Sequence, residues 1–200
     1  RNSVALLYIV FTAKVIYNCL IKLNLKKVGK FAYRSRNMEA VSVVVVGFGD
    51  RAVAYTKYAL AHPDRLKVRA VIDPNPFRRA LAKEMFSLSD DVLYADMSEC
   101  LKLGKIADAV INATMDELHI KTAIPFLKLG YDMLLEKPIT NNREELFELK
   151  RVADAHGCKV MICHVLRYTP FYLKIKRLLL GGELGKLEHI YCSENVGIAH

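Results

Sequence analysis

The sequence predicts an α/β fold with a doubly wound parallel sheet, followed by the start of a second α/β domain that the chain leaves incomplete. Three observations predict this fold. Segments of strand and helix character alternate from residue 41 to residue 163, a glycine-rich turn follows the first strand, and the alternation stops after Cys163. Strands and helices that alternate with right-handed crossovers form a parallel sheet covered on both faces.

Six segments have strand character. Residues 41–46 form a nearly continuous run of β-branched side chains, which is typical of a strand buried on both faces, and Gly47 ends the run. The other five segments lie at 66–72, 92–94, 109–113, 132–135 and 159–163. We therefore expect one complete domain over residues 38–163.

Helical segments separate these strands and are punctuated by helix-ending residues. Pro63 follows the first helix and Gly130 ends the fourth. Asn141 and Glu144 have the spacing of a capping box, so we expect Asn141 to cap the last helix, which Gly157 ends. The other predicted helices occupy residues 51–61, 77–86, 97–103 and 117–129.

The alternation of strand and helix segments stops after residue 163. Residues 171–180 predict a helix, Gly181 and Gly182 break it, and residues 187–193 alternate like an antiparallel strand. We interpret residues 164–200 as the beginning of a second domain that is incomplete in this chain.

Composition is that of an ordinary soluble globular protein. The 200 residues are 52% hydrophobic and 26% charged, which excludes wholesale disorder. Five cysteines, none paired at CxxC spacing, exclude a disulfide scaffold and give no indication of a metal centre. We expect reduced thiols, no bound metal and a cytoplasmic location.

The net charge of +9 is concentrated at one end of the chain. Residues 1–37 contain no acid and supply eight of the nine excess positive charges, so residues 38–200 are nearly neutral. A polyanion-binding protein usually spreads basic residues over a domain surface, so no nucleic-acid partner is expected. The eight basic residues are Arg1, Lys14, Lys22, Lys26, Lys27, Lys30, Arg34 and Arg36.

Residues 1–37 also contain two apolar stretches, 4–12 and 15–21, separated by Lys14. A membrane-spanning helix needs about 20 mostly apolar residues, so we expect no membrane span and no membrane partner. Three interpretations stay open: an interfacial amphipathic anchor, a mitochondrial-type presequence, or non-native sequence upstream of the true start. Met38, just ahead of the first clear strand, favours the third.

The turn after the first strand reads GFGDRA over residues 47–52, which is the G-x-G-x-x-A spacing. Gly47 and Gly49 allow a tight turn in which the backbone, including Phe48, approaches a pyrophosphate at the N-terminus of the following helix. Glycine-rich turns also arise for packing alone. On the first strand of a six-strand α/β domain, the pattern favours dinucleotide binding.

Asp73 ends the second strand, 26 residues after Gly47. A carboxylate there accepts hydrogen bonds from an adenosine ribose and repels a 2′-phosphate, which favours NAD. The alternative role is a turn residue ahead of Pro74. Arg78 and Arg79 lie nearby, and because an arginine accommodates a 2′-phosphate, NADP stays possible.

Glu136, Lys137 and Pro138 follow the fifth strand at a carboxyl strand end, where open α/β sheets place their ligands. A lysine at this edge is suited to donate to a substrate oxygen or to act as an acid or base. By chemistry alone the alternative, a solvated turn, is the more frequent outcome.

These motifs together resemble the Gfo/Idh/MocA oxidoreductases, which are named for glucose–fructose oxidoreductase and inositol dehydrogenase. The resemblance runs from about residue 41 to residue 195 and depends above all on the Glu-Lys-Pro motif at 136–138. It implies an NAD(P)-binding Rossmann domain over 38–163 and a substrate domain from 164. It also implies hydride transfer between nicotinamide and a sugar, inositol or related polyol, and homo-oligomers of the full-length protein.

The resemblance also assigns roles to individual residues. It implies that Lys137 takes part in proton transfer and that Glu136 lies beside the cofactor. Thr114 and His119 match the loop that faces the nicotinamide half, and Arg167 matches an Arg-aromatic-x-Pro element near the nicotinamide.

The chain departs from the family pattern in one respect, and two alternatives to the family's activity stay open. The family's usual Asp and His pair from the second domain is absent, because no Asp follows Gly185. A non-catalytic dinucleotide-binding or regulatory protein is therefore the first alternative. The second is a methyltransferase with a similar glycine-rich loop, although the motif at residues 136–138 argues against it.

Overall fold

The computed structural model describes residues 5–12 and 39–195. The chain divides into two compact units. One is Ser35–Cys163, and the other combines the first segment of the chain with His164–His200. Each unit is described by itself.

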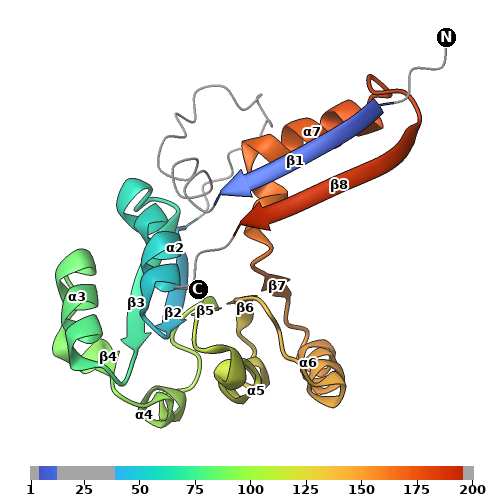
Figure 1. Ribbon diagram of the computed structural model, residues 1–200. Helices are drawn as coiled ribbons and strands as arrows, with labels where there is room; N and C mark the ends of the chain where they lie inside the picture. Colours follow the sequence, from blue (N-terminus) through green and yellow to red (C-terminus); the bar gives the residue numbers. More distant parts are fainter. Residues whose placement is uncertain (1–4, 13–38, 196–200) are drawn as a thin grey trace. The chain divides into compact units, whose positions relative to one another are not determined.

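The larger unit contains a six-stranded parallel sheet with strand order β4-β3-β2-β5-β6-β7 (Figure 1). The chain proceeds from the central strand β2 to β3 and β4 on one side and then returns to β5 on the other. The carboxyl ends of β2 and β5 therefore form the topological switch point of the sheet. The strands are β2 Val41–Val46, β3 Leu66–Ile72, β4 Leu93–Tyr94, β5 Ala109–Asn112, β6 Asp132–Leu135 and β7 Val160–Ile162.

Side chains of β2 alternate between two hydrophobic cores, one on each face of the sheet. Val43 and Val45 pack with buried residues of α2 and α3, whereas Val44 and Val46 pack with buried residues of α4, α5 and α6. A strand buried on both faces explains the continuous run of valines. The helices are α2 Asp50–Ala61, α3 Pro76–Phe86, α4 Met97–Lys102, α5 His119–Lys128 and α6 Arg143–Ala155.

This architecture confirms the predicted doubly wound α/β fold, but the predicted cap of α6 is wrong. Asn142, not Asn141, is the N-cap, and its side chain accepts hydrogen bonds from the backbone N–H groups of Glu144 and Glu145. The backbone N–H of Asn142 in turn donates to the Thr140 hydroxyl. The helix consequently begins one residue later than a cap at Asn141 requires.

The smaller unit contains a two-stranded sheet and a helix. Strand β1, Ala5–Thr12, pairs in parallel with β8, Leu187–Asn195, and α7 spans Pro170–Leu180. The sequence predicted an antiparallel strand over residues 187–193, and the parallel pairing of β8 with β1 corrects that interpretation. The alternation along residues 187–193 indicated a strand, but it did not indicate whether the partner strand runs parallel or antiparallel. The remainder of the 1–37 segment lies outside the described residues.

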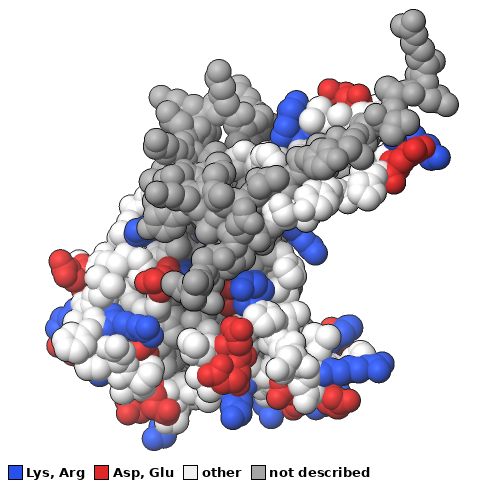
Figure 2. Space-filling model, in the orientation of Figure 1, with Lys and Arg blue, Asp and Glu red and all other residues white. Residues whose placement is uncertain are grey.

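Among the described residues, no helix has both the length and the apolar character needed to cross a membrane. On the face of the molecule in Figure 2, basic and acidic side chains of the described part are interspersed. The absence of a nucleic-acid partner and the cytoplasmic location stay predictions.

Candidate functional site

Gly47 brings the first turn close to the carboxyl end of β5. Its φ is +79°, and a Cβ at this position would lie 2.7 Å from the Ala113 carbonyl oxygen and 2.9 Å from the Thr114 Cα. Glycine is the residue that adopts this conformation without steric cost. The requirement for Gly47 therefore comes from its positive φ and from packing at the switch point.

Helix α2 begins at this turn with Gly49 as its N-cap. Within the described residues, α3, α4 and α6 begin with side-chain caps, from Asn75, Asp96 and Asn142, whereas α2, α5 and α7 begin without one. The first N–H groups of a helix attract anions when no side chain satisfies them. The start of α2 therefore fits a pyrophosphate, as the GFGDRA spacing predicts.

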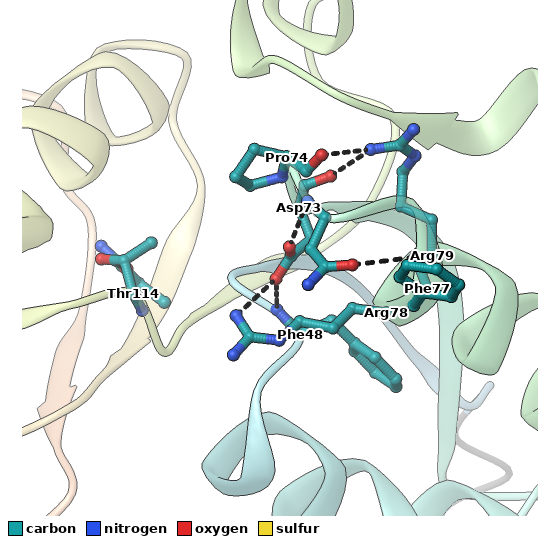
Figure 3. Close-up of polar contacts among 9 residues, drawn as sticks. Phe48, Asp73, Pro74, Phe77, Arg78, Arg79 and Thr114 are labelled. Carbon is teal, nitrogen blue, oxygen red and sulfur yellow. Dashed lines mark hydrogen bonds and ion pairs between the residues drawn. The ribbon is translucent and has the colours of Figure 1, made fainter.

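Asp73 lies directly after β3, and its side chain is only 1% exposed (Figure 3). Its Oδ2 accepts a hydrogen bond of 2.7 Å from the backbone N–H of Phe48, and its Oδ1 accepts one of 2.8 Å from the backbone N–H of Asn75. Asp73 thus connects the glycine-rich turn to the start of α3. Its predicted contact with a ribose stays a prediction.

Two arginines of α3 surround the same turn. Arg78 is about half exposed, and its Nη1 lies 3.5 Å from Asp73 Oδ2. Arg79 donates instead to the carbonyl oxygens of Asp73 and Pro74, at 2.6 and 3.0 Å. Arg78 therefore presents charge at the edge of the turn, whereas Arg79 stabilises the backbone that follows β3 (Figure 3).

On the other side of the switch point, buried polar groups hold the loop after β5. Asn112 accepts a hydrogen bond of 2.9 Å from the Thr114 hydroxyl and donates to the His119 carbonyl and to Thr122. The His119 ring is fully buried, with Nδ1 2.6 Å from the Pro138 carbonyl oxygen and Nε2 3.1 Å from the Thr114 carbonyl oxygen. His119 therefore braces two loops, with both nitrogens occupied by protein.

Glu136 follows β6 and is 6% exposed. Its Oε1 accepts a hydrogen bond from the Tyr55 hydroxyl of α2, and its Oε2 accepts one of 2.9 Å from the backbone N–H of Lys137. The Lys137–Pro138 peptide bond is cis, and the Lys137 side chain is exposed. Glu136 is thus held inside the protein while Lys137 extends from the carboxyl edge of the sheet.

Cys163, at the end of β7, adds a thiol beside this pair. Burial raises the pKa of Cys163 to about 11, and a hydrogen bond with Tyr55 acts in the opposite direction. Burial and the hydrogen bond to Glu136 raise the pKa of Tyr55 above its ordinary value. Tyr55 and Cys163 are therefore both uncharged at neutral pH.

The structure thus groups most of the predicted site residues at one edge of the sheet. Gly47, Phe48, Gly49 and Asp73 lie at the ends of β2 and β3, and Thr114, His119, Glu136 and Lys137 lie at the ends of β5 and β6. Arg167 is exposed in the 3₁₀ turn Val165–Tyr168 of the smaller unit, so its place beside a cofactor stays a prediction.

Tyr55 and Asn112, which were not predicted from the sequence, hold this edge together. Asn112 ends an apolar strand, and a buried polar residue at a carboxyl strand end was an available signal. Tyr55 carries no such signal, because 81 residues separate it from Glu136.

Comparison with known proteins identifies the family. The model of the Gfo/Idh/MocA oxidoreductase family, described as having an NAD-binding Rossmann fold, matches residues 41–164. The chain belongs to the Gfo/Idh/MocA oxidoreductase family. Membership confirms the resemblance and the Rossmann domain, and it confirms NAD as the cofactor that this fold binds.

Similar proteins are much longer than the region that they share with this chain. The putative oxidoreductase YteT of Bacillus subtilis is 28% identical over 132 residues, which cover 62% of this chain and 29% of YteT. Inositol 2-dehydrogenase of Corynebacterium glutamicum strain R is 26% identical over 158 residues, which cover 74% of this chain and 44% of that enzyme. The chain therefore spans less than half the length of these relatives.

The fold is also found among solved structures. Scyllo-inositol dehydrogenase from Lactobacillus casei, solved with bound NAD(H) and scyllo-inositol, superposes with a TM-score of 0.67. The match covers 74% of this chain and 43% of that one, at 19% sequence identity. At this identity the likeness supports the shared fold alone.

Proposed function

We propose that this chain is the dinucleotide-binding part of an NAD(P)-dependent oxidoreductase that acts on a hydroxyl group of a sugar, inositol or related polyol. The observation that carries the proposal is the placement of an uncapped helix start and Lys137 at the same edge of one parallel sheet. The names of the relatives support the substrate class, since one is an inositol 2-dehydrogenase.

The residues at this edge have separable roles. The turn at Gly47 and the start of α2 would hold the pyrophosphate, and Asp73 would support the adenosine side through the backbone of Phe48. Nicotinamide supplies the hydride chemistry when it is bound, while the protein supplies position and electrostatics. Thr114 and Glu136 belong to the loops that would line the nicotinamide side.

Lys137 is the residue proposed to move a proton. Its exposed ammonium has three donors on a flexible stem, and its own backbone N–H is fixed by Glu136. In the oxidative direction the neutral amine of Lys137 would accept the hydroxyl proton of the substrate as the carbon loses a hydride, and it would become an ammonium. In the reverse direction it would return that proton to the oxygen.

Calorimetric titration of the 200-residue chain with NAD, NADP and S-adenosylmethionine tests the binding part of the proposal. We expect micromolar binding of NAD and none of S-adenosylmethionine. Binding of S-adenosylmethionine in place of NAD would instead support a methyltransferase. Binding of NAD without NADH formation in the presence of inositols or sugars would support a non-catalytic dinucleotide-binding protein.

Replacement of Lys137 by alanine tests the catalytic part. We expect turnover to fall about 100-fold, the usual scale for a general acid or base, while NAD affinity is retained. Lys121→Ala is a matched control, because Lys121 is an exposed lysine of α5, a helix that packs against the same sheet. Unchanged turnover in Lys137→Ala would remove Lys137 from the mechanism.

A further inference from the structure

Helix α2 carries two tyrosines with different surroundings. Tyr58 is 43% exposed, and its ring packs on His62 of the same segment, with centroids 4.5 Å apart. Tyr55 is half-buried, packs against the core below α2, and donates its hydroxyl to Glu136. Tyr55 therefore connects the helix that starts at the glycine-rich turn to the loop after β6.

This connection continues through both oxygens of one carboxylate. Glu136 Oε1 accepts from Tyr55, and Oε2 accepts from the backbone N–H of Lys137 at 2.9 Å. Without the phenol, the Lys137 N–H is the one hydrogen-bond donor that the described contacts leave on this carboxylate. A buried carboxylate held by a single donor can turn or draw in water.

The chemistry of Tyr55 suits holding rather than proton transfer. Its pKa is raised by burial and by the acceptor Glu136, so the phenol keeps its proton and donates at any physiological pH. A general acid or base instead requires a pKa near the working pH. The phenol is therefore a permanent donor to Glu136.

We propose that Tyr55 is a positioning residue which, through Glu136, holds the Lys137 loop against the helix of the dinucleotide site. This inference rests on the proposed function, because it assigns Lys137 to the nicotinamide side. It implies that binding of the nicotinamide half of the cofactor depends on the Tyr55 hydroxyl, whereas binding of the ADP-ribose half does not. Asp73 and the start of α2 hold the adenosine side by contacts independent of Tyr55.

The test compares Tyr55→Phe with the matched control Tyr58→Phe in the 200-residue chain. Each variant loses one hydroxyl from the same helix and retains its ring. We expect Tyr55→Phe to weaken NAD binding about fivefold to tenfold, the factor for the net contribution of one ordinary hydrogen bond, and to change ADP-ribose binding less than twofold. Tyr58→Phe should leave both affinities unchanged.

A second measurement needs no cofactor. The backbone amide resonance of Lys137 reports its hydrogen bond to Glu136, so it should shift in Tyr55→Phe and stay in place in Tyr58→Phe. The double variant Tyr55→Phe/Glu136→Ala should bind NAD within twofold of Glu136→Ala alone. This non-additivity is the result expected when Tyr55 acts through Glu136.

Several results would overturn the inference. One is an unmoved Lys137 amide in Tyr55→Phe, and another is an equal loss of NAD and ADP-ribose affinity, which would indicate general damage to the domain. An NAD affinity unchanged by Tyr55→Phe would equally overturn it. Failure of the wild-type chain to bind either ligand would refute the proposed function instead, while the Lys137 amide would still report the Tyr55–Glu136 link.

Discussion

Asp73 and Glu136 are two buried acids that each follow a strand of the same sheet, yet different kinds of donor hold them. Asp73 accepts from two backbone N–H groups, those of Phe48 and Asn75. Glu136 accepts from one backbone N–H in its own loop and from the Tyr55 phenol on a helix 81 positions earlier. The first acid therefore stabilises the path of the main chain, whereas the second depends on a side chain.

This difference separates stability from function at the two ends of the site. Backbone N–H groups stay in place when a side chain is removed, so loss of Asp73 leaves the buried Phe48 N–H without a partner. The Tyr55 phenol is half-buried and lies beside Cys163. When Glu136 is lost, the phenol hydroxyl therefore still has other hydrogen-bond partners. We therefore expect damage to the fold at Asp73 and mainly to ligand positioning at Glu136.

The largest expected effect comes from replacing the two acids in turn by alanine. Asp73→Ala should lower the free energy of unfolding by about 3 kcal/mol, because the Phe48 N–H is left unpaired in the interior. Glu136→Ala should cost about 1 kcal/mol, because its donors are only partly buried. Urea denaturation measures both.

Asp90→Ala is the control for removal of a charge alone. Asp90 pairs with Lys83 at the surface, where an ion pair contributes about 0–1 kcal/mol. A cost for Glu136→Ala equal to or above that for Asp73→Ala would break the comparison.

The next largest effect is expected in the unfolding free energy at alkaline pH. It probes the Glu136 end of the site through the neighbouring thiol of Cys163. Burial raises the pKa of Cys163 from 9.0 to about 11, so between these values the folded chain keeps a proton that the unfolded chain has lost. Stability from this thiol is complete below pH 9 and is lost as the pH rises towards 11, by about 2 kcal/mol.

Cys163→Ala should show a correspondingly smaller fall in unfolding free energy than wild type between pH 9 and pH 11. The difference in slope isolates this thiol from Cys100, whose pKa burial also raises to about 11. Parallel curves for the two proteins would exclude Cys163 as the titrating group.

The smallest effect concerns the helix caps that follow the two acids. Asn75 caps α3 through one N–H and Asn142 caps α6 through two. Each replacement by alanine should cost about 1 kcal/mol, with Asn142→Ala at least as costly as Asn75→Ala. Thermal unfolding of Asn141→Ala, the cap expected from the sequence, should show almost no change.

Much of the larger unit was predictable from local pattern. The run of valines over residues 41–46 indicated a strand buried on both faces, and the structure places alternate valines in two cores. Gly47 was predicted to lie in a tight turn, and its positive φ and its proximity to Ala113 show why this position requires glycine. These features depend on neighbours in sequence or on the burial of a whole segment, so the sequence carries them.

The α6 cap and the β1–β8 pairing were not predictable in the same way. Asn141 and Asn142 are chemically identical side chains, and the choice between them depends on where the loop after the cis peptide enters the helix. The parallel pairing of β1 with β8 joins segments from opposite ends of the chain. No local periodicity records the direction of a partner strand.

The sequence by itself determined the alternation of strands and helices, the dinucleotide turn and the Glu-Lys-Pro motif at residues 136–138. The tertiary structure alone decided that Tyr55, Glu136 and Cys163 meet, that His119 faces two carbonyl groups, and that Asp73 is buried on backbone donors. The physical reason is that strand and turn preferences are local. A hydrogen bond across 81 residues exists because the parallel sheet brings the carboxyl ends of its strands to one edge.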